Sequence, residues 1–221
     1  MSKWFTNLKE QMMEIDRLSK DEPKKPYGHG SQEELSNTYK KYLLSEGIPD
    51  KNPNLPLSTY NRSKFTLWDM VLRFCQNKKV KYILDIASFS GQFPYLCNLN
   101  GLNGFGIDAT VPTFAKKKDF IVELGVFNLV EYFSKEENKF PKFDVITCFN
   151  CPDLAFGYDD EFLEKFKNLI FNSSCKYLIW VCNNNGEIKQ HSNHSEIKGL
   201  KLLKHLSFSN ARHHAIYKVE K

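Results

Sequence analysis

From residue 64 onward, short continuous apolar runs alternate with segments in which apolar residues recur every three or four positions. Apolar runs bounded by turn residues are typical of buried strands, and the three-to-four spacing is typical of amphipathic helices. This alternation predicts an α/β domain with a mostly parallel sheet. The strands expected are residues 82–84, 105–107, 127–133, 143–148 and 176–182, followed by an antiparallel hairpin of residues 201–208 and 211–219.

Helices are expected between these strands, with one exception. The charged residues 134–142 are too few for a helix with two loops, so the helix between the third and fourth strands is expected to be trimmed or missing. Residues 176–182 are apolar almost throughout, as expected of a parallel strand that is covered on both faces. The helices expected are residues 65–75, 93–97, 111–124 and 160–171.

The segment before the first strand has its own pattern. Residues 3–19 carry apolar side chains at helical spacing, and residues 32–45 follow a capping box formed by Ser31 and Glu34. Three prolines make residues 48–59 an extended connection. We therefore divide the chain into an N-terminal helical cap, residues 1–63, and a main domain, residues 64–221. The first helix either packs on the main domain or forms a lid over a site.

The stretch 81–110 is a strand–loop–helix–strand unit with acids at its key positions. Its first strand ends near Asp85 and is followed by small residues up to Gly91, and its second strand ends in Asp108. Such a unit binds a nucleoside at the carboxyl ends of its strands, where the second acid accepts hydrogen bonds from ribose hydroxyls. A dinucleotide would need G-x-G-x-x-G for its pyrophosphate. Here only Gly91 is present, and Phe89 would obstruct a pyrophosphate.

The same stretch resembles motif I of the class I S-adenosylmethionine-dependent methyltransferases, L-D-x-G-x-G-x-G. Leu84, Asp85 and Gly91 match this motif, whereas Ala87 and Phe89 replace its first two glycines. The resemblance implies a Rossmann-like sheet of seven strands, mostly parallel, with a C-terminal antiparallel hairpin and helices on both faces. It implies S-adenosylmethionine as the cofactor.

The resemblance also implies a set of cofactor-binding residues. The loop after the first strand would border the methionine part, the acid after the second strand would hold the ribose, and a residue of the third strand would lie near the adenine. Residues after the fourth strand would line the reaction centre. The residues expected at these places are Asp85, Ala87, Ser88, Phe89 and Gly91; Asp108 and Ala109; Glu131 or Tyr132; and Phe149 and Asn150.

Methyl transfer to an oxygen needs a base or a charge stabiliser beside the acceptor. Asp153 follows the fourth strand and is one candidate, and His191, after the fifth strand, and His29, in the N-terminal loop, are others because histidine titrates near neutral pH. Asn150 and Pro152 alternatively match two of the four positions of the N-P-P-Y motif of amino-group methyltransferases. A polar loop with a proline turn is the third interpretation of this segment.

Composition narrows the function. The 221 residues are 41% hydrophobic and 14% aromatic, enough for a packed core, and the net charge of +5 is mild. Nucleic-acid binding usually shows a clustered basic face, so the charge does not favour that partner. No apolar run approaches the roughly 20 residues of a membrane helix. The start of the chain leads into an amphipathic pattern, so we expect no signal peptide.

Six cysteines without framework spacing indicate reduced thiols and a cytoplasmic location. Cys148 and Cys151 form a C-x-x-C, but zinc needs about four ligands, so no metal is expected.

Three hypotheses follow. The first is a methyltransferase that acts on a small-molecule acceptor, an oxygen of a metabolite or sugar. The second is a methyltransferase-like binding protein without turnover, motivated by the replaced glycines. The third is a nucleic-acid amino-methyltransferase. The sequence leaves the oligomeric state open, with a homodimer as one alternative.

Overall fold

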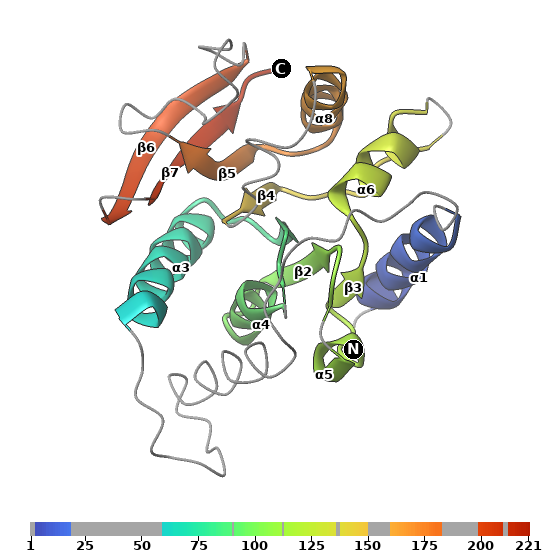
Figure 1. Ribbon diagram of the computed structural model, residues 1–221. Coiled ribbons are helices and arrows are strands. Elements are labelled where there is room, and N and C mark those ends of the chain that lie inside the picture. Colours follow the sequence, from blue (N-terminus) through green and yellow to red (C-terminus); the bar gives the residue numbers. More distant parts are fainter. Residues whose placement is uncertain are drawn as a thin grey trace.

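A seven-stranded sheet with helices on both faces forms the protein (Figure 1). The computed structural model describes residues 3–18, 59–89, 91–111, 113–135, 138–149, 160–182, 199–209 and 212–221. The strands are β1 (Tyr82–Ile86), β2 (Asn103–Asp108), β3 (Ile121–Glu123), β4 (Val145–Cys148), β5 (Tyr177–Cys182), β6 (Leu200–Ser209) and β7 (Arg212–Val219). The helices are α1 (Lys3–Leu18), α3 (Thr59–Asn77), α4 (Gln92–Leu99), α5 (Thr113–Lys116), α6 (Val126–Phe133) and α8 (Asp160–Asn172).

The strand order is β3-β2-β1-β4-β5-β7-β6. Strands β1 to β5 are parallel, and β7 is antiparallel to both of its neighbours, β5 and β6. The predicted fold class is therefore confirmed, including the C-terminal hairpin. Because the chain moves outward from β1 to β3 and then returns to the other side of β1, the sheet has a topological switch point between β1 and β4. Ligands of such sheets bind at the carboxyl ends of the strands beside this point.

Two hydrophobic clusters cover the two faces of the sheet. Helices α3 and α4 pack on one face, where Val71 and Phe93 lie with Ile83 of β1. Helices α1, α6 and α8 pack on the other face, which carries Leu84 of β1 and the buried Phe166. Neighbouring residues of β1 thus point to opposite clusters, as the pleat of a strand requires.

The predicted helix at 111–124 and the predicted strand at 127–133 were both wrong. Within 111–124 the chain forms the short helix α5 and then strand β3. The third strand is β3, only three residues long, and residues 127–133, expected to be a strand, belong to helix α6 (Val126–Phe133). The four buried residues of α6 are Val126, Leu129, Val130 and Phe133. They stand at i, i+3, i+4 and i+7, which is the helical spacing. A helix, α6, is therefore present between the third and fourth strands, where we expected the helix to be trimmed or missing.

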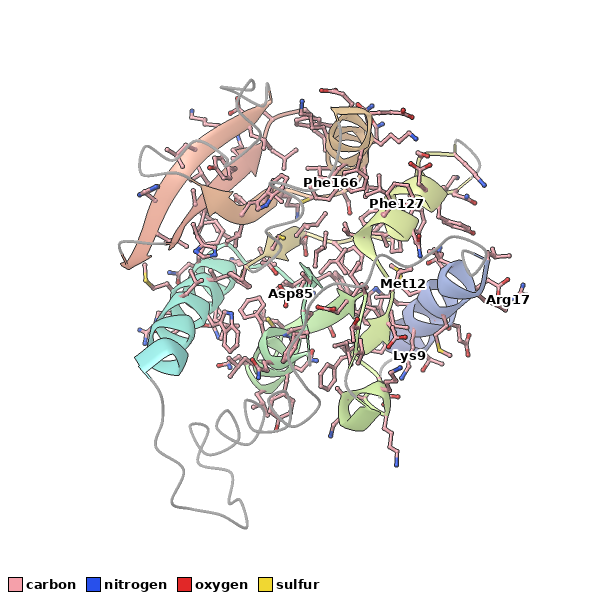
Figure 2. All side chains as sticks on the ribbon, viewed as in Figure 1. Lys9, Met12, Arg17, Asp85, Phe127 and Phe166 are labelled. Carbon is pink, nitrogen blue, oxygen red and sulfur yellow. The ribbon has the colours of Figure 1, made fainter. Side chains whose placement is uncertain are left out.

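Helix α1 packs into the main domain. Figure 2 shows Met12 on the side of α1 that faces the sheet and Arg17 pointing away from it. The indole ring of Trp4 lies 4.8 Å from the ring of Tyr82 and 5.9 Å from that of Phe143, centroid to centroid. Both partners stand at the amino ends of strands, so this part of α1 lies at the edge opposite to the carboxyl ends.

The part of the predicted cap between α1 and α3, residues 19–58, lies outside the described residues. The helix expected at 32–45 lies outside the described residues, as does nearly all of the extended connection at 48–59. A lid role for this part, and a boundary at residue 63, stay predictions. Within the described ranges, no helix combines the length and apolar character needed to cross a membrane.

Candidate functional site

The loop between β1 and α4 has an unusual backbone. Three of its residues adopt positive φ angles: Ala87 at 56°, Phe89 at 61° and Gly91 at 76°. These are the three positions that motif I gives to glycine. A residue with a Cβ atom pays roughly 1–2 kcal/mol for this left-handed conformation, which glycine adopts freely. The loop therefore keeps the backbone of a glycine-rich turn although only one of the three glycines is present.

The end of β2 holds this loop in place. The backbone N–H of Ser88 donates to the carbonyl of Ile107 at 2.9 Å, and the N–H of Phe89 donates to Oδ2 of Asp108 at 2.7 Å. The N–H of Gly91 closes the turn by donating to the carbonyl of Ser88 at 3.0 Å. These bonds fix the direction in which the chain leaves β1.

Two glycines of β2 allow the loop and α4 to lie directly on the strand. A Cβ atom on Gly106 would come within 2.5 Å of Oγ of Ser88, and one on Gly104 would come within 2.7 Å of the carbonyl oxygen of Pro94. Real Cβ atoms do not approach so closely, so any side chain at these positions would displace the loop or α4. Sequence reasoning did not single out these glycines, although two glycines in one short strand signal a close backbone approach.

The two predicted acids lie at the carboxyl ends of neighbouring strands, Asp85 as the last residue but one of β1 and Asp108 as the last of β2, and both are buried. Asp85 is 3% exposed, and its Oδ1 accepts a hydrogen bond of 2.6 Å from Oγ1 of Thr147, its partner residue on β4. Asp108 is 4% exposed. Besides the Phe89 N–H at Oδ2, its Oδ1 accepts the N–H of Thr110 at 2.9 Å. Donors from this chain thus stabilise both buried carboxyl groups.

A third acid, Glu123, ends β3 beside Asp108. Its Oε2 accepts the backbone N–H of Val111 at 3.2 Å and lies 2.6 Å from Nζ of Lys116. Acids therefore stand at the carboxyl ends of three adjacent parallel strands. Sequence reasoning missed Glu123, although Ile121-Val122-Glu123 repeats the pattern of an apolar run closed by an acid that marks the first two strands.

Glu131 and Tyr132 do not end a strand, because they lie on α6. Oε1 of Glu131 forms an ion pair of 2.8 Å with Nζ of Lys165 on α8. Hydrogen bonds to Glu131 and Glu161 raise the pKa of Lys165. Glu131 thus joins two helices, and the third-strand position belongs to Glu123.

Phe149 directly follows β4 and is buried. Its ring meets the ring of Phe93 of α4 edge-on at 4.9 Å, and its carbonyl oxygen lies 2.9 Å from Nε2 of His214 on β7. Ala109 lies half-buried in the loop after β2.

Other predicted site residues fall in parts of the chain that are not described. Asn150 and the three candidate bases, Asp153, His191 and His29, lie outside the described residues, so their roles stay predictions. Among the residues that are described, no group of three histidine, cysteine or acidic side chains could hold a metal ion.

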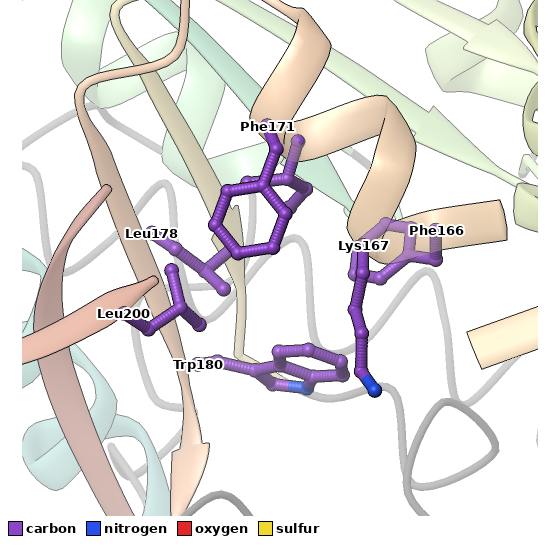
Figure 3. Close-up of a pocket in the computed structure, with 7 residues that line it drawn as sticks. Phe166, Lys167, Phe171, Leu178, Trp180 and Leu200 are labelled. Atoms are coloured by element: carbon purple, nitrogen blue, oxygen red, sulfur yellow. The ribbon is translucent and has the colours of Figure 1, made fainter. Parts of the chain in front are cut away.

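A pocket open to solvent, of about 190 Å³ with its mouth included, lies on the face of the sheet that α1, α6 and α8 cover (Figure 3). It is enclosed by α8, β5 and the start of β6, and contains none of the predicted site residues. Its lining is apolar apart from the lysine: Phe166, Lys167, Ile170, Phe171, Leu178, Trp180 and Leu200.

Comparisons with known proteins identify the fold. No model of a known protein family matches the chain, and no curated protein matches it in sequence. Among solved structures, magnesium protoporphyrin IX methyltransferase from Synechocystis PCC 6803 with bound SAM is similar, with a TM-score of 0.54 at 11% identity over 89% of this chain and 100% of that one. The same enzyme with bound SAH gives a TM-score of 0.53 at 12% identity, over 85% and 95%.

The PH0226 protein from Pyrococcus horikoshii OT3 is also similar. It gives a TM-score of 0.50 at 13% identity over 74% of this chain and 92% of that one. Together with the observed strand order, these similarities lead to one conclusion: the chain has the fold of the class I S-adenosylmethionine-dependent methyltransferases.

Proposed function

We propose that this protein is an S-adenosylmethionine-dependent methyltransferase that acts on a small molecule, at an oxygen of a metabolite or sugar. One observation carries the proposal. The loop after β1 keeps positive φ angles at Ala87, Phe89 and Gly91, the three glycine positions of motif I. Strain of this kind persists only where the surrounding structure enforces it, and it concentrates at functional sites.

The charges around the loop fit this cofactor better than a dinucleotide. Asp85, Asp108 and Glu123 lie at the carboxyl ends of the three strands beside the loop, and Lys116 is paired with Glu123. Carboxylates attract the positive sulfonium of S-adenosylmethionine and repel a diphosphate. In this proposal Asp108, at the end of β2 and bonded to the loop, would accept hydrogen bonds from ribose hydroxyls.

A bound S-adenosylmethionine would supply a methyl group on a positively charged sulfur, and S-adenosylhomocysteine would be the leaving group when the methyl carbon passes to the acceptor. The chain's own residues would bind the cofactor and orient it. The hydroxyl of Thr147 holds the carboxylate of Asp85, and Asp108 fixes the loop amide of Phe89. The buried ring of Phe149, just after β4, packs against that of Phe93 on α4. Asp153, His191 and His29 remain our candidates for the base that takes the acceptor's proton.

A small acceptor is favoured over a nucleic acid by two features. The net charge of +5 is mild for a chain of this length. The similar Synechocystis enzyme is named for a small-molecule acceptor, magnesium protoporphyrin IX. A cap formed by the N-terminal residues that follow α1 would enclose such an acceptor.

Isothermal calorimetry with S-adenosylhomocysteine tests the proposal. We expect saturable binding, and we expect Asp108→Ala to weaken it by about 5- to 150-fold, which corresponds to roughly 1–3 kcal/mol for lost hydrogen bonds to a charged group. Glu123→Gln should also weaken binding. The matched control is Glu131→Gln, which removes an acid from the α6–α8 ion pair and should leave the affinity unchanged. Folded wild-type protein that gives no heat up to millimolar ligand would contradict the proposal.

The second candidate is a binding protein without turnover. It is favoured by Phe89, whose bulky side chain stands where the motif has a glycine. The two candidates differ in one observation: a binding protein takes up S-adenosylmethionine but never consumes it with any panel of acceptors, whereas the enzyme releases S-adenosylhomocysteine.

A further inference from the structure

We propose that His214 is a positioning residue for the reaction side of the site: its imidazole holds the carbonyl of Phe149 and so sets the path of the chain where it leaves β4. This inference rests on the proposed function. His214 belongs to the antiparallel strand β7 and to no known motif of the sequence.

The geometry begins with a break in the sheet. The ladder between β4 and β5 ends at the pair Cys148–Trp180, so Phe149 is the first residue after it. Two strands away from β4, His214 pairs with Val181 of β5. Its side chain crosses β5 and brings Nε2 to 2.9 Å from the carbonyl oxygen of Phe149. The imidazole therefore provides the hydrogen bond where the strand ladder no longer does.

Burial makes this bond important. His214 is 3% exposed and Phe149 is 5% exposed, so water does not replace the interaction. A buried backbone carbonyl that loses its partner costs roughly 1–3 kcal/mol, and the chain would move to recover one. Because a carbonyl only accepts hydrogen bonds, Nε2 must carry the proton, which fixes the neutral ring in the Nε2–H tautomer.

Phe149 and His214 also link the end of β4 to helix α4, which follows the loop after β1. The ring of Phe149 lies 5.9 Å from that of His214 and 4.9 Å from that of Phe93, which in turn lies 6.1 Å from Trp68 of α3. Phe93 stands in the first turn of α4, directly after the cofactor loop. A shift of Phe149 would therefore displace Phe93 and with it α4, the helix that begins where this loop ends. His214 does not contact the loop itself, so its effect on a ligand would pass through Phe149.

The test uses two substitutions that separate donation from packing. His214→Gln keeps an N–H donor of similar reach, whereas His214→Leu fills the space without a donor. By calorimetry we expect His214→Leu to bind S-adenosylhomocysteine about 5- to 10-fold more weakly, the equivalent of one lost hydrogen bond. His214→Gln should stay within about twofold of the wild type, even if its melting temperature falls as far as that of His214→Leu.

A histidine with only a structural role gives a different result. Affinity would then be unchanged in both folded variants, or would fall equally in both, and either result would overturn the inference while leaving the proposed function intact. Wild-type protein that does not bind the ligand would overturn the proposed function, and this inference with it.

A measurement on the wild type decides the matter if His214→Leu does not fold. In protein with ¹⁵N-labelled histidine, the Nε2–H signal of His214 should be present and should shift when S-adenosylhomocysteine is added. An Nδ1–H tautomer, or a signal that the saturating ligand leaves in place, would contradict the proposal.

Discussion

One carboxylate at the end of β2 organises the strained loop after β1. Oδ2 of Asp108 accepts the N–H of Phe89, one of the two non-glycine loop residues with a positive φ angle. The carbonyl of Ile107 accepts the N–H of Ser88 beside it. The loop conformation thus depends on hydrogen bonds from a neighbouring strand, and these bonds oppose the strain of two side chains in the left-handed region.

Replacing Ala87 by glycine should stabilise the protein. Ala→Gly usually destabilises because the unfolded chain gains freedom, but at a φ of 56° the relief of left-handed strain is larger. We expect the free energy of unfolding to rise by about 0.5–1 kcal/mol in urea titrations. Ala109→Gly is the matched control: Ala109 lies in the next loop at a negative φ, so it should lower stability. Equal effects of the two substitutions would show that the strain at Ala87 is negligible.

Removing the hydroxyl of Thr147 should destabilise the protein through Asp85. Thr147→Val keeps the shape of the side chain but removes the donor at 2.6 Å from a buried carboxylate. We expect a loss of about 1.5–3 kcal/mol in the free energy of unfolding, the range for a hydrogen bond to a charged group. Thr147→Ser retains the hydroxyl and should recover most of this loss. A valine variant as stable as the wild type would mean that other donors suffice for Asp85.

At the scale of elements, α1 is part of the core. Its residues Leu8, Met12 and Ile15 are buried against the same cluster as α6 and α8. Nζ of Lys9 also donates to the carbonyl of Lys118, just before β3, at 2.7 Å. The helix therefore covers the sheet near its β3 edge and is needed to complete the second face.

Adjacent methionines of α1 allow a direct test of this packing. Met12 is fully buried, whereas Met13 is 53% exposed. Met12→Ala should lower the free energy of unfolding by roughly 2–5 kcal/mol because it removes apolar contacts and leaves a cavity. Met13→Ala should change it by less than about 0.5 kcal/mol, since it removes a surface side chain. Similar losses at both positions, measured by urea unfolding, would argue against the packing of α1 described above.

At the scale of the whole molecule, a carboxylate joins the strands at the edge of the sheet opposite to the proposed site. Asp144 stands before β4 at the amino ends of the strands. Its Oδ2 accepts the backbone N–H groups of Lys81 and Tyr82 at 2.9 and 3.1 Å, and its Oδ1 pairs with Nζ of Lys176 at 2.7 Å. One carboxylate thus ties the starts of β1, β4 and β5 together, at the opposite ends of the strands from the proposed site.

Asp144 should contribute to acid unfolding. Partial burial tends to raise the pKa of its carboxyl, but the hydrogen bonds from Lys176 and the two backbone N–H groups outweigh this and lower the pKa. A group with a lowered pKa in the folded state stabilises above its unfolded pKa of about 4, and this contribution is lost as the pH falls through the folded pKa. Stability should therefore decline with acidification below about pH 5.

Urea unfolding of Asp144→Asn between pH 7 and pH 3 measures this contribution. The variant should be less stable than the wild type at pH 7, and the difference should shrink toward pH 3. Its affinity for S-adenosylhomocysteine at pH 7 should be unchanged. Asp69→Asn removes a carboxylate from an exposed ion pair with Arg73 and serves as the control, with little expected effect. Wild-type and Asp144→Asn curves that run parallel over the whole range would contradict the assignment.

The accuracy of the sequence predictions depended on the length of each element. Strand β5 was predicted because its apolar run is continuous. Strands β1, β2 and β4 and the C-terminal hairpin were predicted because shorter apolar stretches lie between turn residues or charged residues. β3 has only Ile121 and Val122 before its acid, too few to stand out. Residues 127–133 were assigned to a strand because they are mostly apolar, although the buried residues of α6 follow the helical period. Glu123 was missed for the same reason.

The sequence by itself determined the features that depend on near neighbours: the α/β alternation, the loop after Asp85, and the acid at Asp108. Tertiary structure decided what these residues do with one another. The left-handed backbone at Ala87 and Phe89 is not what either residue prefers, and the N–H of Phe89 is held by a carboxylate 19 positions away. The bond between His214 and Phe149 spans 65 positions. Such partners meet only when strands pair across the sheet, and no local spacing of residues encodes that meeting.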